Sequence, residues 1–162
     1  MSGAADVRII TYDPAYARAF ADLNYQWIEQ FFTVEQHDRE MLENPGEYII
    51  DAGGEIFFAI ADEIAVGTAA LISDAKGEFE LAKMAVSPEY RGRGIGDMLI
   101  DAAVEYSRAK GKDSIYLLSN TVLKPAIGLY RKHGFVETPM IDESPYQRTN
   151  IRMQLALHTS RL

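Results

Sequence analysis

The chain of 162 residues contains no cysteine, a single tryptophan and only six prolines. Without a thiol there is no disulfide, no cysteine metal ligand and no cysteine nucleophile. No apolar run approaches the ~20 residues that cross a bilayer, and residues 1–10 lack the basic segment and apolar stretch of a secretory signal. We therefore expect a cytoplasmic protein without a membrane partner.

Positive charge is also scarce. Lys and Arg number 16 against 24 Asp and Glu, which gives a formal net charge of −8. Such a surface repels phosphate backbones, so we expect no nucleic-acid partner. The acidic field mildly favours cationic substrates, although solubility alone would account for it. The three histidines, His37, His133 and His158, lack the spacing of metal ligands, so we expect no metal. His133 fits the last turn of a helix.

Hydrophobic residues make up 48% and charged residues 25% of the chain, which is typical of a globular protein. The length fits one domain over residues 1–162. The expected strands are 7–11, 55–61, 65–73, 79–86, 114–118, one beginning at 135, and 150–157. One helix is expected to begin at Asp13-Pro14, and three more are expected at 34–42, 96–110 and 124–133. The order β-α-α-β-β-β-α-β-α-β-β predicts an α/β (α+β) fold with a mixed sheet.

A glycine-rich segment, Arg91-Gly92-Arg93-Gly94-Ile95-Gly96, joins a predicted strand to a predicted helix. The first turn of a helix offers unpaired N–H groups, and glycines let a ligand approach them, so a pyrophosphate is a natural occupant. Arg91 and Arg93 can add charge-assisted hydrogen bonds. The spacing fits neither a P-loop nor the G-x-G-x-x-G dinucleotide fingerprint. Taken alone, the segment is also compatible with a turn carrying two solvated arginines.

The pattern Arg91-x-x-Gly94-x-Gly96 resembles the signature of the GNAT superfamily of N-acetyltransferases, and matches it in full. Residues 81–90 upstream and Ala126-x-x-Leu129-Tyr130-x-x-x-Gly134-Phe135 downstream are also similar to that family, so the close match covers residues 79–136. The resemblance implies a GNAT-like single domain. Its mostly antiparallel sheet would have about seven strands and be flanked by about four helices.

The resemblance also implies acetyl-CoA as co-substrate. The backbone of Met84 to Val86 would pair with the pantetheine arm, and residues 91–96 would hold the pyrophosphate. Asn120 would hydrogen-bond the pantetheine, Ala126 would lie against the cofactor, and Tyr130 would lie near the sulfur. The implied cofactor-binding residues are Met84, Ala85, Val86, Arg91, Gly92, Arg93, Gly94, Ile95, Gly96, Asn120, Ala126 and Tyr130.

Acetyl transfer requires that the amine lose a proton and that the departing thiolate gain one. With no cysteine, we expect direct transfer in a ternary complex. Tyr130 is the candidate general acid, and a packed helix residue is the alternative. Glu80, at a strand position where some family members carry their catalytic glutamate, is the candidate base, since burial would raise its pKa. A solvated Glu80, with Glu78 as base, stays open.

The acceptor is expected to be a small amine or an amino-acid-like molecule. Alternatives are the lysines or N-termini of proteins, or a CoA-binding sensor without catalysis. Family members often form dimers, so the resemblance allows a homodimer. Three groups of residues are expected near the acceptor. The aromatic group, Trp27, Phe31 and Phe32, could equally be core, and the acidic group, Glu29, Glu35 and Asp38, would attract a cationic amine. The third is the segment 140–147 with Tyr146.

Overall fold

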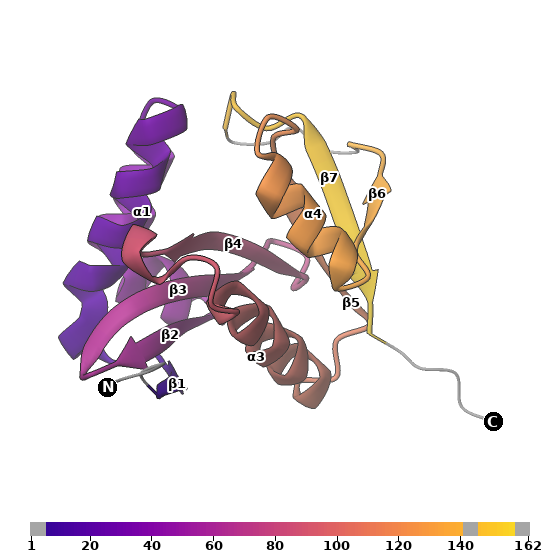
Figure 1. Cartoon of the computed structure of the whole chain (residues 1–162). Helices are drawn as coiled ribbons and strands as arrows, with labels where there is room; N and C mark the ends of the chain where they lie inside the picture. Colours follow the sequence, from indigo (N-terminus) through magenta and orange to yellow (C-terminus); the bar gives the residue numbers. More distant parts are fainter. Residues whose placement is uncertain (1–5, 141–145, 158–162) are drawn as a thin grey trace.

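A seven-stranded sheet with two α-helices on each face makes up the fold (Figure 1). The computed structural model describes residues 6–140 and 146–157. The strands are β1 (Val7–Thr11), β2 (Glu55–Ala61), β3 (Ile64–Ser73), β4 (Phe79–Val86), β5 (Ser114–Ser119), β6 (Val136–Thr138) and β7 (Ile151–Ala156). The helices are α1 (Ala17–Phe31), α2 (Gln36–Glu43), α3 (Ile95–Ala109) and α4 (Lys124–Lys132). The predicted order of strands and helices is confirmed.

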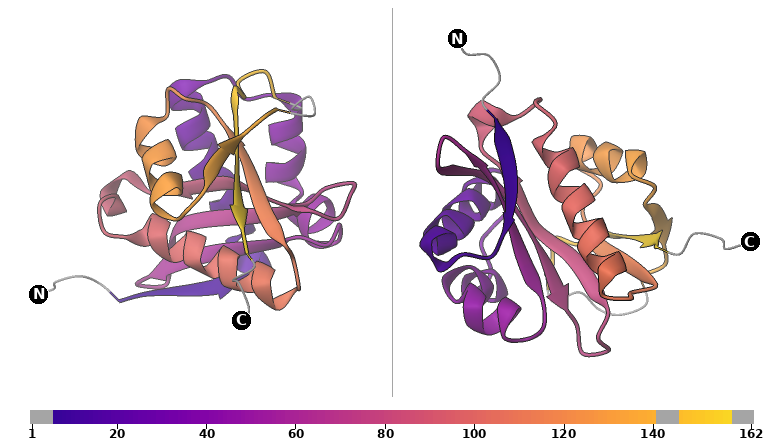
Figure 2. Two further views of the ribbon diagram at one scale, coloured as in Figure 1. Left: turned by 90° about the vertical axis from the view of Figure 1, so that its right-hand side faces the viewer. Right: turned by 90° about the horizontal axis from the view of Figure 1, so that it is seen from below.

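The strands lie in the order β1-β2-β3-β4-β5-β7-β6, and every neighbouring pair is antiparallel except β4 and β5. These two parallel strands pair over only two positions, Phe79 with Ile115 and Glu80 with Tyr116. Beyond Glu80 the strands diverge, and Figure 2 shows β5 and β7 running steeply across the direction of β2 to β4. The sheet is therefore split along one side of β4.

Helices α1 and α2 cover one face of the sheet, and α3 and α4 lie on the other (Figure 2). Both faces of the central strands are thus buried, which explains why β2 and β3 read as nearly continuous apolar runs. Phe58 packs with Phe20 and Leu42 under α1 and α2, whereas its neighbour Phe57 packs with Leu99 under α3. Two cores, one on each face, hold the split sheet in place.

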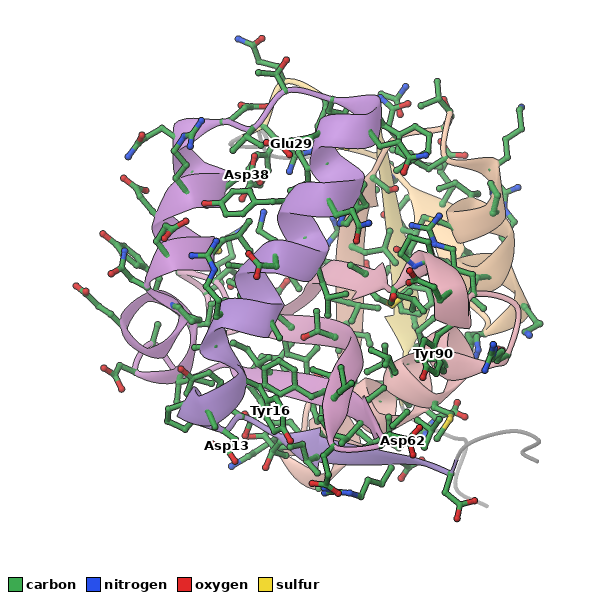
Figure 3. The ribbon with its side chains drawn as sticks, turned by 60° about the vertical axis from the view of Figure 1, so that its left-hand side comes forward. Asp13, Tyr16, Glu29, Asp38, Asp62 and Tyr90 are labelled. Carbon is green, nitrogen blue, oxygen red and sulfur yellow. The ribbon has the colours of Figure 1, made fainter. Side chains whose placement is uncertain are left out.

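Local signals set most boundaries. The side chain of Asp13 accepts a hydrogen bond from the N–H of Ala15 at 2.9 Å, and a 3-10 turn, Pro14–Tyr16, precedes α1. Figure 3 shows Asp13 and Tyr16 at this start of the helix. The predicted stop after α2 is also found, but a π-helical turn, Gly46–Ile50, follows it. This turn was not predicted, and it is anchored by the fully buried Ile49.

Candidate functional site

A β-bulge interrupts β4 at the point where the sheet splits. Ala82 pairs with Ala70 and Ala85 with Thr68, so β4 has one residue more than β3 between these pairs. Lys83, at φ 53°, has the left-handed backbone that a bulge imposes on it. The amine of Lys83 consequently reaches α2, while Met84 and Val86 pack with the α3 core. The bulge leaves the β5 side of β4 without a strand partner beyond Glu80.

A first cleft of about 370 Å³ occupies this opening. The predicted cofactor-binding residues that line it are Met84, Ala85, Val86, Arg91, Asn120, Ala126 and Tyr130. They come from β4, from the loop after it, from the end of β5 and from α4. The fold thus brings together segments that the sequence places up to 46 residues apart, from Met84 to Tyr130. Trp27, Phe31 and Phe32 line the same cleft, and the 52% exposure of Phe31 excludes a core position for it.

The glycine-rich turn leads directly into α3. Gly92 at φ 76° and Gly94 at φ 80° have left-handed backbones, and Gly94 caps the helix without any side-chain hydrogen bond. The first helical bond runs from the N–H of Met98 to the carbonyl of Gly94, so the preceding amides lack an intrahelical partner. A Cβ on Gly96 would lie 2.9 Å from Leu129, which shows how closely α3 approaches α4. The turn therefore offers free amides beside the first cleft.

Two arginines and one neutralised acid surround these amides. The Nε of Arg91 donates to the carbonyl of Val86 at 3.3 Å, and the guanidinium of Arg93 lies 4.7 Å from the centre of the Tyr90 ring. Asp97, in the first turn of α3, is 2.7 Å from both Lys132 and His133. These hydrogen bonds lower the pKa of Asp97. The ammonium of Lys132, at the end of α4, offsets a charge that would otherwise repel an anion here, and His133 contacts the same carboxylate.

Tyr130 presents an unused hydroxyl to the first cleft. Its ring packs edge-on against Phe135, with centroids 6.0 Å apart. No group in residues 6–140 or 146–157 hydrogen-bonds this hydroxyl. Burial raises the pKa of Tyr130 to about 12, so the phenol stays protonated at neutral pH. The side chain can therefore donate a proton or a hydrogen bond to a ligand.

The side chain of Asn120 is already engaged. Its amide donates to the carbonyl of Arg148 at 2.6 Å, and its side-chain oxygen accepts from the N–H of Val122 at 2.9 Å. These bonds hold the loop after β5 against the loop before β7. Asn120 lines the first cleft, and within the described residues its second N–H and the second lone pair of its oxygen are left for a ligand.

Glu80 lies in the last paired position of β4 and β5, where the first cleft meets a second cavity. Burial raises its pKa to about 7, Asp74 adds to the rise, and Lys83 opposes it. Such a carboxylate is partly ionised at neutral pH, as a general base must be. The alternative base, Glu78, is exposed and lines only the second cavity.

The second cavity, of about 530 Å³, was not predicted from the sequence. Its walls include His37 from α2, Asp74 from the β3–β4 turn, Tyr116 from β5, and Arg152 from β7. The two hollows share Glu80, Ala82, Leu118 and Tyr146. Tyr146 was expected in this region and lines both, whereas residues 141–145 of the expected wall, like His158, lie outside the described residues.

A buried ion cluster separates the two hollows on the α2 side. The fully buried carboxylate of Asp38 accepts from Lys83 at 2.7 Å and from both terminal nitrogens of Arg148 at 2.9 and 2.7 Å. Lys83 also donates to the hydroxyl of Tyr146 at 2.8 Å. Although burial opposes ionisation, the bonds from Arg148 and Lys83 hold the pKa of Asp38 at about 2.

The expectation that Asp38 attracts a cationic amine is therefore wrong, because two cations of the chain itself already surround it. Figure 3 shows Asp38 between α1 and α2, while the exposed Glu29 lies towards the end of α1. A lysine in the middle of an apolar strand could have indicated a buried pair, since charged residues are seldom buried alone. The sequence could not tell which acid would be the partner.

In the described part of the chain, no group of three or more His, Cys, Asp or Glu is placed to hold a metal ion. No helix there is long and apolar enough to span a membrane.

Comparison with known proteins finds similarity to one family and to acetyltransferases within the curated proteins. The model of the family described as "Acetyltransferase (GNAT) family" matches residues 21–135. Streptothricin acetyltransferase of Streptomyces lavendulae is 33% identical over 112 residues, which are 68% of this chain and 59% of that protein. An uncharacterised N-acetyltransferase of Methanocaldococcus jannaschii is 37% identical over 62 residues, 38% of this chain and 27% of that one. The chain thus spans less than two thirds of either relative.

Solved structures show the same fold. An acetyltransferase of the GNAT family from Staphylococcus aureus superposes with a TM-score of 0.86 at 24% identity, over 94% of this chain and 100% of that one. A putative acetyltransferase of Salmonella typhimurium, solved with acetyl-CoA, gives a TM-score of 0.73 at 19% identity, over 96% of each chain. The predicted GNAT-like single domain is confirmed.

Proposed function

We propose, because the chain belongs to the acetyltransferase (GNAT) family, that it transfers an acetyl group from acetyl-CoA to the amine of a small or amino-acid-like acceptor. The observation that supports this most is the split between β4 and β5. The split leaves the backbone of Met84 to Val86 open along a cleft that also contains Tyr130. Location in the cytoplasm and a homodimer stay predictions from the sequence.

The residues present fit acetyl-CoA. An extended arm with amide groups can pair with an open strand edge, as peptides do when they add to a sheet. The free amides at the start of α3 suit a pyrophosphate, and Arg91 and Arg93 flank them. When bound, acetyl-CoA supplies the activated acetyl group and a thiolate leaving group. The chain holds the arm, orients the thioester and moves the protons.

Glu80 and Tyr130 are proposed for the two proton transfers. An amine with a pKa near ~10 is mostly protonated at neutral pH, so a base must take its proton before it can attack. Glu80, where the two hollows meet, would take that proton directly or through a water. Tyr130, whose hydroxyl has no partner among the described residues, would give its proton to the departing sulfur. With no cysteine in the chain, the acetyl group would pass directly to the amine.

The test is thiol release from acetyl-CoA, measured with a panel of small amines, amino acids, peptides with free N-termini, and a lysine-rich protein. We expect turnover with a small acceptor and intersecting lines in a double-reciprocal plot. Parallel lines would contradict direct transfer, and turnover confined to peptides or proteins would contradict a small acceptor. Tight CoA binding without turnover on any amine would instead identify a CoA-binding sensor.

A further inference from the structure

The second cavity contains several acidic side chains, but the structure already uses or exposes them. One oxygen of Asp74 accepts the backbone N–H groups of Lys76 and Glu78, both at 2.9 Å, and the other accepts the hydroxyl of Tyr116 at 2.9 Å. Asp74 therefore holds the β3–β4 turn and orients Tyr116. Glu78 is exposed, and Glu80 is the proposed base.

Arg152 differs from these acids because its positive charge has no counter-ion among residues 6–140 and 146–157. The two N–H groups of its Nη1 point to Thr138 at 2.7 Å and Gln154 at 2.9 Å, and its guanidinium lies 4.6 Å from the centre of the Tyr116 ring. Throughout the described ranges, no carboxylate forms an ion pair with it. An unpaired guanidinium is thus fixed in the wall of the second cavity.

The remaining donors of Arg152 form a defined edge. A guanidinium has five N–H groups, and two of them are taken by Thr138 and Gln154. The Nε and Nη2 groups are left, and these are two parallel donors that match the two oxygens of a carboxylate. Stacking on Tyr116 and the bonds from Nη1 hold this edge in one orientation, so little side-chain entropy is lost when it binds.

Arg152 and Glu80 also lie at a suitable separation. Glu80 is paired with Tyr116 on β5, and Tyr116 is paired with Gln154 on β7, two residues from Arg152. Arg152 is therefore two strands away from Glu80, about 10 Å between strand axes. Both side chains line the same cavity, so one acceptor lying in it could contact both.

We propose that the acceptor carries a carboxylate as well as its amine, and that the Nε–Nη2 edge of Arg152 binds this carboxylate while the amine lies at Glu80. The inference rests on the proposed acetyl transfer and narrows its substrate class to amino acids and similar amino carboxylates. A polyamine has no carboxylate for Arg152 to bind, so it does not fit the proposed site.

The test uses matched acceptors. Each amino acid is compared with its carboxamide, which keeps the amine and removes the negative charge. A charge-assisted bidentate contact predicts kcat/KM roughly 10- to 100-fold higher for the acid than for the amide. In Arg152→Gln, kcat/KM for the acid should fall by about the same factor, while that for the amide changes less than about twofold. Arg152→Lys keeps the charge but not the two parallel donors, so its kcat/KM for the acid should lie between those of the wild type and Arg152→Gln.

Arg8→Gln is the matched control, because it removes an exposed arginine on β1 and should leave kcat/KM for both acceptors unchanged. Equal kcat/KM for acid and amide in the wild type would overturn the carboxylate site and leave acetyl transfer intact. An equal loss for both acceptors in Arg152→Gln would also overturn it, because Arg152 would then act through the structure alone.

If no amine is acetylated, the proposed function fails, and the carboxylate site is tested by calorimetry with the amino acids themselves. Binding to the wild type that is lost in Arg152→Gln would support the site. Equal or absent binding in both proteins would overturn it.

Discussion

The first cleft and the second cavity meet at Glu80 but are built in different ways. The first is formed by an open strand edge of β4, by aromatic side chains at the end of α1 and by one side of α4, and it lies next to the start of α3. The second is lined largely by charged, polar and aromatic side chains from α2, the β3–β4 hairpin, β5, β7 and Tyr146. Binding in the first depends on where strands and helices run, whereas binding in the second depends on individual side chains. We therefore expect the first to set the donor and the second to select the acceptor.

The largest effect is expected from a substitution at the boundary between the two regions, where the loss of Asp38 should lower the stability of the fold. Asp38→Ala leaves Lys83 and Arg148 without their shared carboxylate, and an uncompensated buried charge destabilises a protein by about 3–5 kcal/mol. Chemical denaturation should show this decrease in the free energy of unfolding.

The matched control for Asp38→Ala is Glu35→Ala. Glu35 and Asp38 form the two halves of one capping box, but Glu35 is partly exposed and 3.6 Å from Arg148. Its removal should cost only about 1 kcal/mol. Equal losses for both variants would mean that the capping box, and not the buried charge, is what matters.

Within the first cleft, Tyr130→Phe removes only the hydroxyl. Loss of a positioned general acid lowers kcat by about 100- to 1000-fold, while the dissociation constant of acetyl-CoA should stay within about twofold because the ring still packs on Phe135. Steady-state kinetics and calorimetry measure the two quantities separately. An unchanged kcat would leave Tyr130 as a packing residue.

Where the two regions meet, Glu80→Gln should change the pH dependence of kcat/KM. In the proposed mechanism the ionised form of Glu80 is the active one, so wild-type kcat/KM should rise as the pH increases through about 7. The variant should lose this limb and be about 100-fold slower at neutral pH. A pH–rate profile that keeps the same limb would remove Glu80 from the mechanism.

Stability gives an independent measurement on Glu80. Its pKa is raised from 4.5 to about 7 in the fold, so the folded state keeps a proton that the unfolded chain releases. Wild-type stability should therefore decrease as the pH rises from 4.5 to 7, and Glu80→Gln should abolish this decrease. Thermal unfolding at several pH values measures it, and identical pH dependence in both proteins would contradict the raised pKa.

The smallest effects are expected from alanine substitutions of the glycines at the two ends of α3. Gly94 at φ 80° and Gly111 at φ 78° share a left-handed backbone, so alanine at either should destabilise by about 1–2 kcal/mol. Only Gly94→Ala should also weaken the binding of acetyl-CoA, by roughly 10-fold, since it alters the amides that we propose bind the pyrophosphate. Calorimetry with CoA tests this, and equal weakening by both variants would point to general loss of stability.

Much of the fold could be predicted from local signals. Apolar periodicity gave the order of strands and helices, Asp13-Pro14 marked the start of the first helix, and the pair Asp62-Glu63 marked the β2–β3 hairpin, where both residues have positive φ. These signals work because capping, turn geometry and burial act over a few neighbouring residues. The π-helical turn at Gly46–Ile50 was missed because its anchor, Ile49, is held by contacts from distant strands.

The candidate site shows the same division. The sequence by itself determined the glycine-rich turn, the helix that follows it and the positions of Glu80 and Tyr130, since each depends on backbone conformation or on a short motif. Only the tertiary structure decided that Asp38 is neutralised by Lys83 and Arg148, and that Arg152, beside Tyr116, has no carboxylate partner in the part of the chain that the structure describes. The physical reason is that charge pairing depends on distance in space, and these partners lie up to 110 residues apart along the chain.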